Sequence, residues 1–273
     1  MPHDPEAPGE PSDAARALLA QIAQFARERG LQLCGVVAAH EFDATQPAGR
    51  RAAERRSACG TVLVLASGGR SCWEHVVAAH GGRLEAARPG YHPIDAWSRA
   101  IADAVIAMLH AAGLGAQASY PDEPQPLNFR QLAEQAGLGT ISPVLGHLLH
   151  PEYGPWVSLR VAILIDGTPF GVSPGEPLDF DPCTPCDQPC VRACPAEVYA
   201  RGGGAQLERC ATHRLGGGCR DGCATLRACP VGAAHRYGPA EERFRSAYSL
   251  FAMRRWLGVG RWKFVPQRWR RRP

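Results

Sequence analysis

Two cysteine-rich stretches, DPCTPCDQPCVRACP (181–195) and ERCATHRLGGGCRDGCATLRACP (208–230), are the most informative part of the sequence. They hold eight of the chain's 11 cysteines, and each stretch ends in a Cys-Pro step, at Cys194 and at Cys229. Eight thiolates make two sets of four. In two-cluster ferredoxins the last cysteine of each run ligates the cluster of the other run. The pattern therefore predicts a module that carries two iron–sulfur clusters and transfers single electrons.

The same crossing rule assigns the eight cysteines to two [4Fe-4S] clusters. The first predicted set is Cys183, Cys186, Cys190 and Cys229, and the second is Cys194, Cys210, Cys219 and Cys223. The spacing departs from the usual bacterial run, because three residues instead of two separate Cys186 from Cys190. Cysteine quartets with CxxC knuckles also suit zinc, so two zinc ions are the alternative.

Composition favours a reducing compartment. The chain has 273 residues and an odd, tightly clustered number of cysteines, which argues against a secreted disulfide scaffold. The polar start, MPHDPEAPGEPSD, lacks the apolar core of a secretory signal, and no apolar run is long enough to span a membrane. We therefore expect a cytoplasmic protein, with a monomer favoured.

The pattern of apolar residues predicts an α+β protein in four parts. Residues 1–11 are expected to be a disordered leader, 12–176 an α/β domain, 177–240 the cysteine module, and 241–273 a basic, aromatic C-terminal segment. Strands are predicted at 31–39, 61–66 and 157–165. Helices are predicted from Ser12 or Asp13 to Gly30, from a cap at Asp95 to about 112, and over 127–136.

The segment LAEQAGLGTISPVLGHLLHPEYGPWVSLRVAILI (132–165), followed by two cysteine runs, resembles the epoxyqueuosine reductase family. The order of features is similar from about residue 15 to 235. The resemblance implies an N-terminal cobalamin-binding domain of the cobalamin-processing or nitroreductase-like type, followed by a bacterial-type double-cluster ferredoxin domain. It also implies a reaction in which the clusters reduce cobalamin to Co(I) and an epoxide oxygen is removed reductively.

The resemblance also implies functional residues. The proton donor of the family corresponds to Glu123, with Asp122 beside it, although PDEP could equally be an exposed acidic turn. Cobalamin contacts are implied at a YH step and at the AGLG segment, namely Tyr91, His92, Gly137, Leu138, Gly139, Thr140, Ile141 and Ser142. The chain departs from the family at 140–143, where Thr-Ile-Ser-Pro replaces Trp-Ile-Gly-Lys, and it lacks the C-terminal helical repeats of longer members.

Several features leave alternatives open. His92, His147 and His150 could ligate a metal, but polar loop or core histidines are favoured. The last 20 residues carry eight Arg or Lys and no acid, interleaved with tryptophan, which would suit tRNA, an anionic membrane surface, or packing on the body. Cys34 is expected to be a buried core thiol. The leading hypothesis is a cobalamin-dependent iron–sulfur reductase of tRNA modification, supplied by an external low-potential electron donor. The alternative is an electron carrier or corrinoid-reducing partner without substrate chemistry.

Overall fold

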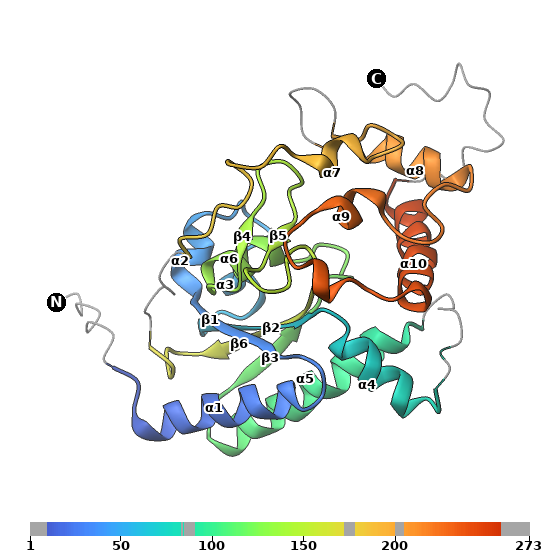
Figure 1. Ribbon diagram of the computed structural model, residues 1–273. Helices are drawn as coiled ribbons and strands as arrows, with labels where there is room; N and C mark the ends of the chain where they lie inside the picture. The colour runs from blue at the N-terminus through green and yellow to red at the C-terminus, as the bar shows by residue number, and fades with distance from the viewer. Residues whose placement is uncertain (1–9, 83, 85–90, 172–177, 200–204, 258–273) are drawn as a thin grey trace.

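A four-stranded antiparallel sheet lies at the centre of the N-terminal part of the chain (Figure 1). This computed structural model describes residues 10–82, 84, 91–171, 178–199 and 205–257. Across the sheet the order is β1 (Leu33–Ala38), β2 (Cys59–Gly68), β6 (Val157–Asp166) and β3 (Ala116–Ser119), and all neighbours are antiparallel. The three predicted strands are therefore confirmed, and β3 is an edge strand that the sequence did not indicate.

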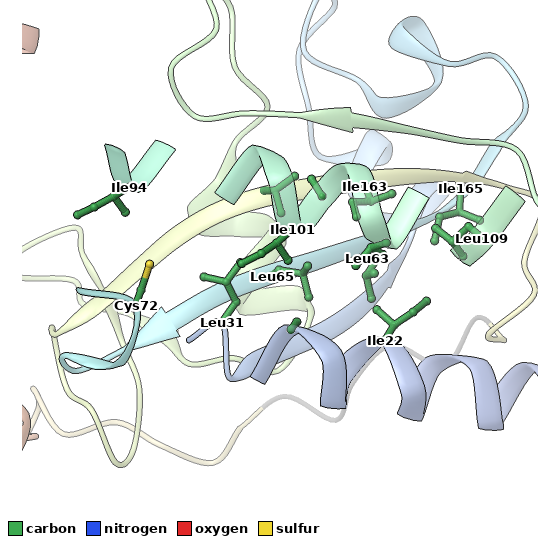
Figure 2. Packing of buried hydrophobic residues seen from close by; sticks show 14 of the residues in the cluster. Ile22, Leu31, Leu63, Leu65, Cys72, Ile94, Ile101, Leu109, Ile163 and Ile165 are labelled. Carbon is green, nitrogen blue, oxygen red and sulfur yellow. The ribbon is translucent and has the colours of Figure 1, made fainter. Parts of the chain in front are cut away.

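The two faces of the sheet are covered by different helices. One face carries α1 (Asp13–Arg27), α4 (Ser71–Ala79) and α5 (Pro93–Ala111), and the other carries α2 (Ala39–Ala44), α3 (Ala52–Arg55) and α6 (Phe129–Gln135). Figure 2 shows the first of these two cores, which contains Leu63 and Leu65 of β2 and Ile22 of α1. Because successive side chains of a strand point to opposite faces, Val62 and Val64 belong to the second core.

Two helix starts show how local sequence sets the elements. Ser12 caps α1, where its side chain accepts a hydrogen bond from the backbone N–H of Ala15. The predicted cap of α5 at Asp95 was wrong. The helix begins at Pro93, and His92 is the cap, with Nδ1 accepting from the backbone N–H of Asp95 at 3.2 Å. The physical reason is Pro93, since proline has no N–H to satisfy and its fixed φ suits the first helical position.

The cysteine-rich region forms short helices beyond a small hairpin of β4 (Thr140–Ile141) and β5 (Leu148–Leu149). These are α7 (Pro189–Arg192), α8 (Leu207–Leu215), α9 (Ala224–Ala228) and the 3-10 helix η1 (Ala233–His235). Figure 1 shows α7, α8 and α9 together at one end of the molecule. None of the described helices is long and apolar enough to span a membrane.

The last helix, α10 (Pro239–Leu257), joins the cysteine-rich region to the N-terminal sheet domain. It runs along the side of the molecule from beside α4 toward α8 (Figure 1). Its Phe244 ring lies 5.3 Å from that of Trp73 on α4, and its Tyr248 ring lies 3.9 Å from the His92 ring. The predicted boundary between 240 and 241 therefore falls inside a helix. The leader 1–9 and the tail 258–273 lie outside the described residues.

Candidate functional site

The eight clustered cysteines line two separate cavities, four on each. The smaller cavity, of about 20 Å³, is lined by Cys183, Cys186, Cys190 and Cys229. The larger, of about 310 Å³, is lined by Cys194, Cys210, Cys219 and Cys223. Each cavity thus takes three thiols from one run and the last thiol of the other run. We call the set on the smaller cavity the first quartet and the set on the larger cavity the second quartet. The cavities that they line are called the first and the second cavity.

Backbone geometry around the first quartet is set by local hydrogen bonds. Asp181 Oδ1 accepts from the backbone N–H groups of Cys183 and Thr184, both at 3.1 Å, which turns the chain at the first cysteine. Gln188 has a φ of 54° and directs the chain into α7, which carries Cys190. Helix α7 packs against α9, and Cys229 follows the last residue of α9. This contact brings the fourth thiol to the first run.

The second quartet is built from more distant pieces. Cys210 lies on α8, Cys219 has a φ of 50°, and Cys223 is the N-cap of α9. Burial raises the pKa of Cys210, and the neighbouring Cys223, Cys219 and Cys194 raise it further. In the first quartet, burial likewise raises the pKa of Cys229, with further contributions from Cys183 and Cys186. Four crowded thiols resist ionisation, so a bound cationic centre would relieve their repulsion.

The chemistry of the donors matches iron–sulfur clusters. Each cavity presents four thiols, which is the ligand set of a [4Fe-4S] cluster and also of a structural zinc ion. In the part of the chain that the structure describes, no group of three or more His, Cys, Asp or Glu side chains is arranged to hold a metal ion. The thiols of the second quartet line a cavity of about 310 Å³, whereas those of the first line one of about 20 Å³. The donor chemistry of both quartets suits a [4Fe-4S] cluster or a zinc ion.

The segment 137–142 lies against the first quartet. The Ser142 hydroxyl is 3.3 Å from the Cys183 sulfur and also accepts from the backbone N–H of Leu145 at 3.0 Å. The Thr140 hydroxyl donates to the carbonyl of Phe180, and Glu134 accepts from the backbone N–H of Ile141 at 2.6 Å. The polar groups of this segment are thus occupied by contacts within the protein.

The other implied cobalamin residues lie on the opposite side of the sheet. Tyr91 is exposed, at 52% of its surface, just before α5. His92 caps α5 and is covered by Tyr248 and Phe244 of α10, with its Nε2 buried and unpartnered among the described residues. Helix α5 covers one face of the sheet and α6, which leads into 137–142, covers the other. The two implied segments therefore adjoin helices that pack on opposite faces of the sheet.

The two candidate proton donors have different surroundings. The Glu123 carboxylate accepts from Arg55 Nη1 at 2.5 Å, from the Ser119 hydroxyl at 2.9 Å, and from the backbone N–H of Tyr120 at 2.9 Å. These contacts fasten the loop after β3. Asp122 is paired with Arg99 at 2.7 Å and lines a third cavity. The structure thus gives Glu123 a structural role and leaves Asp122 beside open space.

The third cavity has a volume of about 120 Å³ and lies between α5, β6 and α10. Its polar lining combines acids, bases and phenols in near-balanced charge. The lining residues are Asp95, Ser98, Arg99, Tyr120, Pro121, Asp122, Leu159, Arg160 and Tyr248. The second cavity is lined by the neighbouring Val157 of β6 and by Arg245, Ser246 and Ser249 of α10. The second quartet and the third cavity therefore share two structural elements.

Sequence reasoning assigned no role to Tyr248, which belongs to no recognisable motif, or to Trp156, which lies within the segment 132–165 that carries the resemblance. Tyr248 donates to Asp95 Oδ2 at 3.1 Å, and burial raises its pKa to about 12. Trp156 is 1% exposed and lines the second cavity. The signals for Trp156 were its place in the PEYGPW stretch (151–156) and its position directly before a buried strand. Tyr248 lies on α10, whose apolar residues do not gather on one face. The sequence therefore did not indicate which face of α10 packs against the sheet domain.

The other histidines and cysteines have structural surroundings. His147 lines the second cavity, and burial lowers its pKa. His150 is fixed by accepting from the backbone N–H of Glu152 at 3.0 Å, as the alternative of a polar loop histidine predicts. Cys34 is partly exposed beside α1 and burial of its thiol raises its pKa to about 12. Cys72 is buried in the core of the sheet domain.

The fold is shared with two groups of reductases. A selenomethionine-labelled epoxyqueuosine reductase is 16% identical, with a TM-score of 0.59, over 84% of this chain and 69% of its own. An epoxyqueuosine reductase solved with an epoxyqueuosine-modified tRNA stem loop is 18% identical, with a TM-score of 0.57 and the same coverage. A catabolic reductive dehalogenase in complex with 3-bromo-4-hydroxybenzoic acid is 19% identical, with a TM-score of 0.55, over 92% of this chain and 38% of its own.

Comparison of the sequence gives no match to a protein-family model and none to a curated protein. At identities below one fifth, the structural likeness shows the fold alone. The chain thus has the mixed α/β fold that epoxyqueuosine reductases and reductive dehalogenases share. The resemblance predicted from residues 132–165 is confirmed at this level.

Proposed function

We propose that this chain is an oxidoreductase whose two quartets hold two [4Fe-4S] clusters and whose third cavity receives the group to be reduced. The grouping of the eight cysteines around two cavities, with Cys194 and Cys229 exchanged between the runs, carries the proposal. When bound, the clusters would supply single electrons. The shared fold of two groups of reductases agrees with this reading.

The reduction that we propose is the removal of an epoxide oxygen, following the resemblance. Loss of that oxygen as water consumes two electrons and two protons, so the site needs an acid. Asp122 is the proposed donor because it lines the third cavity and its side chain is 42% exposed, which allows exchange of protons with solvent. Arg99 would hold this carboxylate at the cavity wall, while Glu123 keeps the loop in place.

Three of the residues that the resemblance implied for cobalamin already make contacts within the protein. The polar groups of Thr140 and Ser142 are used within the protein, and His92 is covered by α10 on the other side of the sheet. Cobalamin dependence therefore rests on the resemblance and the fold alone, and the proposed electron path does not require it. This separation of segments also favours a second candidate function, an electron carrier without substrate chemistry of its own.

Two partners are part of the proposal. A groove beside the second quartet is lined by Arg220 and Arg243, both exposed, together with Cys219. This groove would suit an acidic electron-carrier protein, because opposite charge speeds association. A tRNA substrate is proposed from the resemblance and the basic tail, whose contacts lie outside the described residues. The cytoplasmic location stays a prediction.

Protein purified without oxygen tests the proposal in order. We expect iron and sulfide in equal amounts and a brown absorbance that dithionite bleaches. Protein that contains zinc and no sulfide would refute the proposal of iron–sulfur clusters. Retention of cobalamin on gel filtration is measured next, because failure to bind leaves either a cobalamin-independent reductase or the electron carrier. Turnover of epoxyqueuosine-bearing tRNA by loaded, reduced protein then separates these. Unchanged tRNA would remove epoxyqueuosine as the substrate.

A further inference from the structure

Three buried polar groups on the second cavity have no hydrogen-bond partner among the described residues. They are Nε1 of Trp156, Oγ1 of Thr225 and Nη2 of Arg245. Trp156 and Thr225 are each 1% exposed, so bulk solvent does not reach them. A buried donor without an acceptor is costly, and native structures rarely keep one without reason. Three on one cavity indicate that an acceptor belongs inside it.

The other contacts of these residues leave the three groups without a partner among the described residues, and Glu241 Oε2 is likewise unpartnered. The Trp156 indole can only donate, and its ring meets the Tyr237 ring edge-on at a centroid distance of 5.0 Å. Arg245 uses Nε on Glu241 Oε1 at 2.8 Å and Nη1 on the Ser158 hydroxyl at 3.4 Å, which leaves Nη2 over. Thr225 lies on α9, two residues after Cys223. The acceptors on this cavity wall include the four sulfurs of the second quartet, the hydroxyls of Ser246 and Ser249, and the Glu242 carboxylate, which already accepts from Arg227.

The first cavity has a different lining. Its non-cysteine wall is mainly apolar, with Val144, Leu145, Leu149, Pro182, Pro230 and Val231. Its one hydroxyl, on Ser142, already contacts backbone N–H groups and Cys183. None of the unpartnered buried side-chain atoms among the described residues belongs to this cavity. The two quartets therefore differ in the number of free donors around them.

We propose that Trp156, Thr225 and Arg245 donate hydrogen bonds to the sulfurs of the second cluster and make it the cluster of higher reduction potential. The inference rests on the proposed function, since it needs both clusters. Reduction adds one negative charge, and hydrogen bonds to sulfur together with the Arg245 charge stabilise that charge. An electron supplied by the external donor would then reside mainly on the second cluster, beside the third cavity, with no bond made or broken.

The test is a redox titration of the anaerobically loaded protein, followed by electron paramagnetic resonance. Trp156→Phe keeps the ring and removes the N–H, and Thr225→Val keeps the volume and removes the hydroxyl. Each should lower the potential of one cluster by up to about 59 mV, which corresponds to a tenfold change for one electron. The other cluster should not shift. A Cys219→Ala/Cys223→Ala variant identifies the signal of the second quartet.

A matched control is Trp97→Phe, because Trp97 Nε1 donates to the backbone carbonyl of Arg29 in the sheet domain. This variant should leave both potentials unchanged. If fully loaded Trp156→Phe and Thr225→Val proteins have unshifted potentials, the inference is refuted while the proposed function stands. A shift confined to the first quartet has the same consequence. Wild-type protein that takes up no iron overturns the proposed function as well. If Trp156→Phe fails to fold, Thr225→Val still decides.

Discussion

Tyr248 of α10 donates a hydrogen bond of 3.1 Å to Oδ2 of Asp95 on α5, and so ties the C-terminal helix to the sheet domain. The other oxygen of the same carboxylate accepts from Arg160 Nη2 on β6. Asp95 therefore holds three elements together at the wall of the third cavity. The ring of Tyr248 also covers His92, the cap of α5. Helix α10 is thus an integral part of the candidate site.

Asp95 should stabilise the fold in a pH-dependent way. Burial alone raises the pKa of Asp95, but His92 and Arg160 outweigh it and hold this pKa well below its usual range. Asp95→Ala should lower the free energy of unfolding by about 3 kcal/mol at pH 7, because the partly buried Arg160 loses its partner. A depressed folded-state pKa gives stability above the unfolded-state pKa, which is lost as pH falls through the folded-state pKa.

The difference between wild type and Asp95→Ala should therefore shrink as pH falls from about 5 toward 2 in urea unfolding experiments. Asp103→Ala is the control, since Asp103 is exposed on the same helix. A difference that stays constant across this pH range would refute the account of Asp95.

The crossing of the quartets can be tested by single substitutions. Cys194→Ala should lose the same paramagnetic signal as Cys210→Ala, although Cys194 belongs to the first run. Cys229→Ala should match Cys183→Ala, and each variant should lose about half of the iron. Cys34→Ala, whose thiol lies beside α1, should keep both signals. If Cys194→Ala instead matches Cys183→Ala, the assignment of quartets is wrong.

The two acids after β3 should respond differently to substitution. Glu123→Gln removes the charge that meets Arg55 and should lower the free energy of unfolding by about 1–2 kcal/mol. Asp122→Asn should leave the melting temperature nearly unchanged, because its ion pair with Arg99 is largely exposed. If Asp122 donates the proton, turnover of the substrate by the loaded enzyme should fall at least tenfold in Asp122→Asn. Equal turnover with wild type would exclude that role.

The three cysteines outside the quartets should be slow to alkylate in the folded protein. Burial raises the pKa of Cys34 to about 12 and that of Cys59 to about 11, and it also raises the pKa of Cys72. Because the thiolate is the reactive form, iodoacetamide should label them slowly at pH 7, and faster as pH approaches these values. Peptide mass spectrometry of native and urea-unfolded protein measures this. Rapid labelling of native Cys34 at pH 7 would contradict the raised pKa.

Long apolar runs made the sheet predictable, whereas contacts between distant segments were not. Strands β2 and β6 each contain an apolar run, VLVLA (62–66) and VAILI (161–165), and the Cys-Pro steps indicated which thiols would be exchanged. Asp is a more usual capping residue than His, which favoured Asp95 as the cap of α5. Pro93 at the first helical position instead makes His92 the cap. The resemblance implied one cofactor site for Tyr91, His92 and 137–142, and these segments adjoin helices on opposite faces of the sheet. Their separation depends on which face each helix covers, and periodicity alone does not specify that.

Iron and acid-labile sulfide, counted per chain in anaerobically purified protein, test the central claim most directly. Two [4Fe-4S] clusters predict about eight iron atoms and about eight sulfides per chain, with both falling by about half in Cys219→Ala. Two zinc ions per chain and no sulfide, in protein that remains folded, would contradict the account and leave the quartets as structural zinc sites.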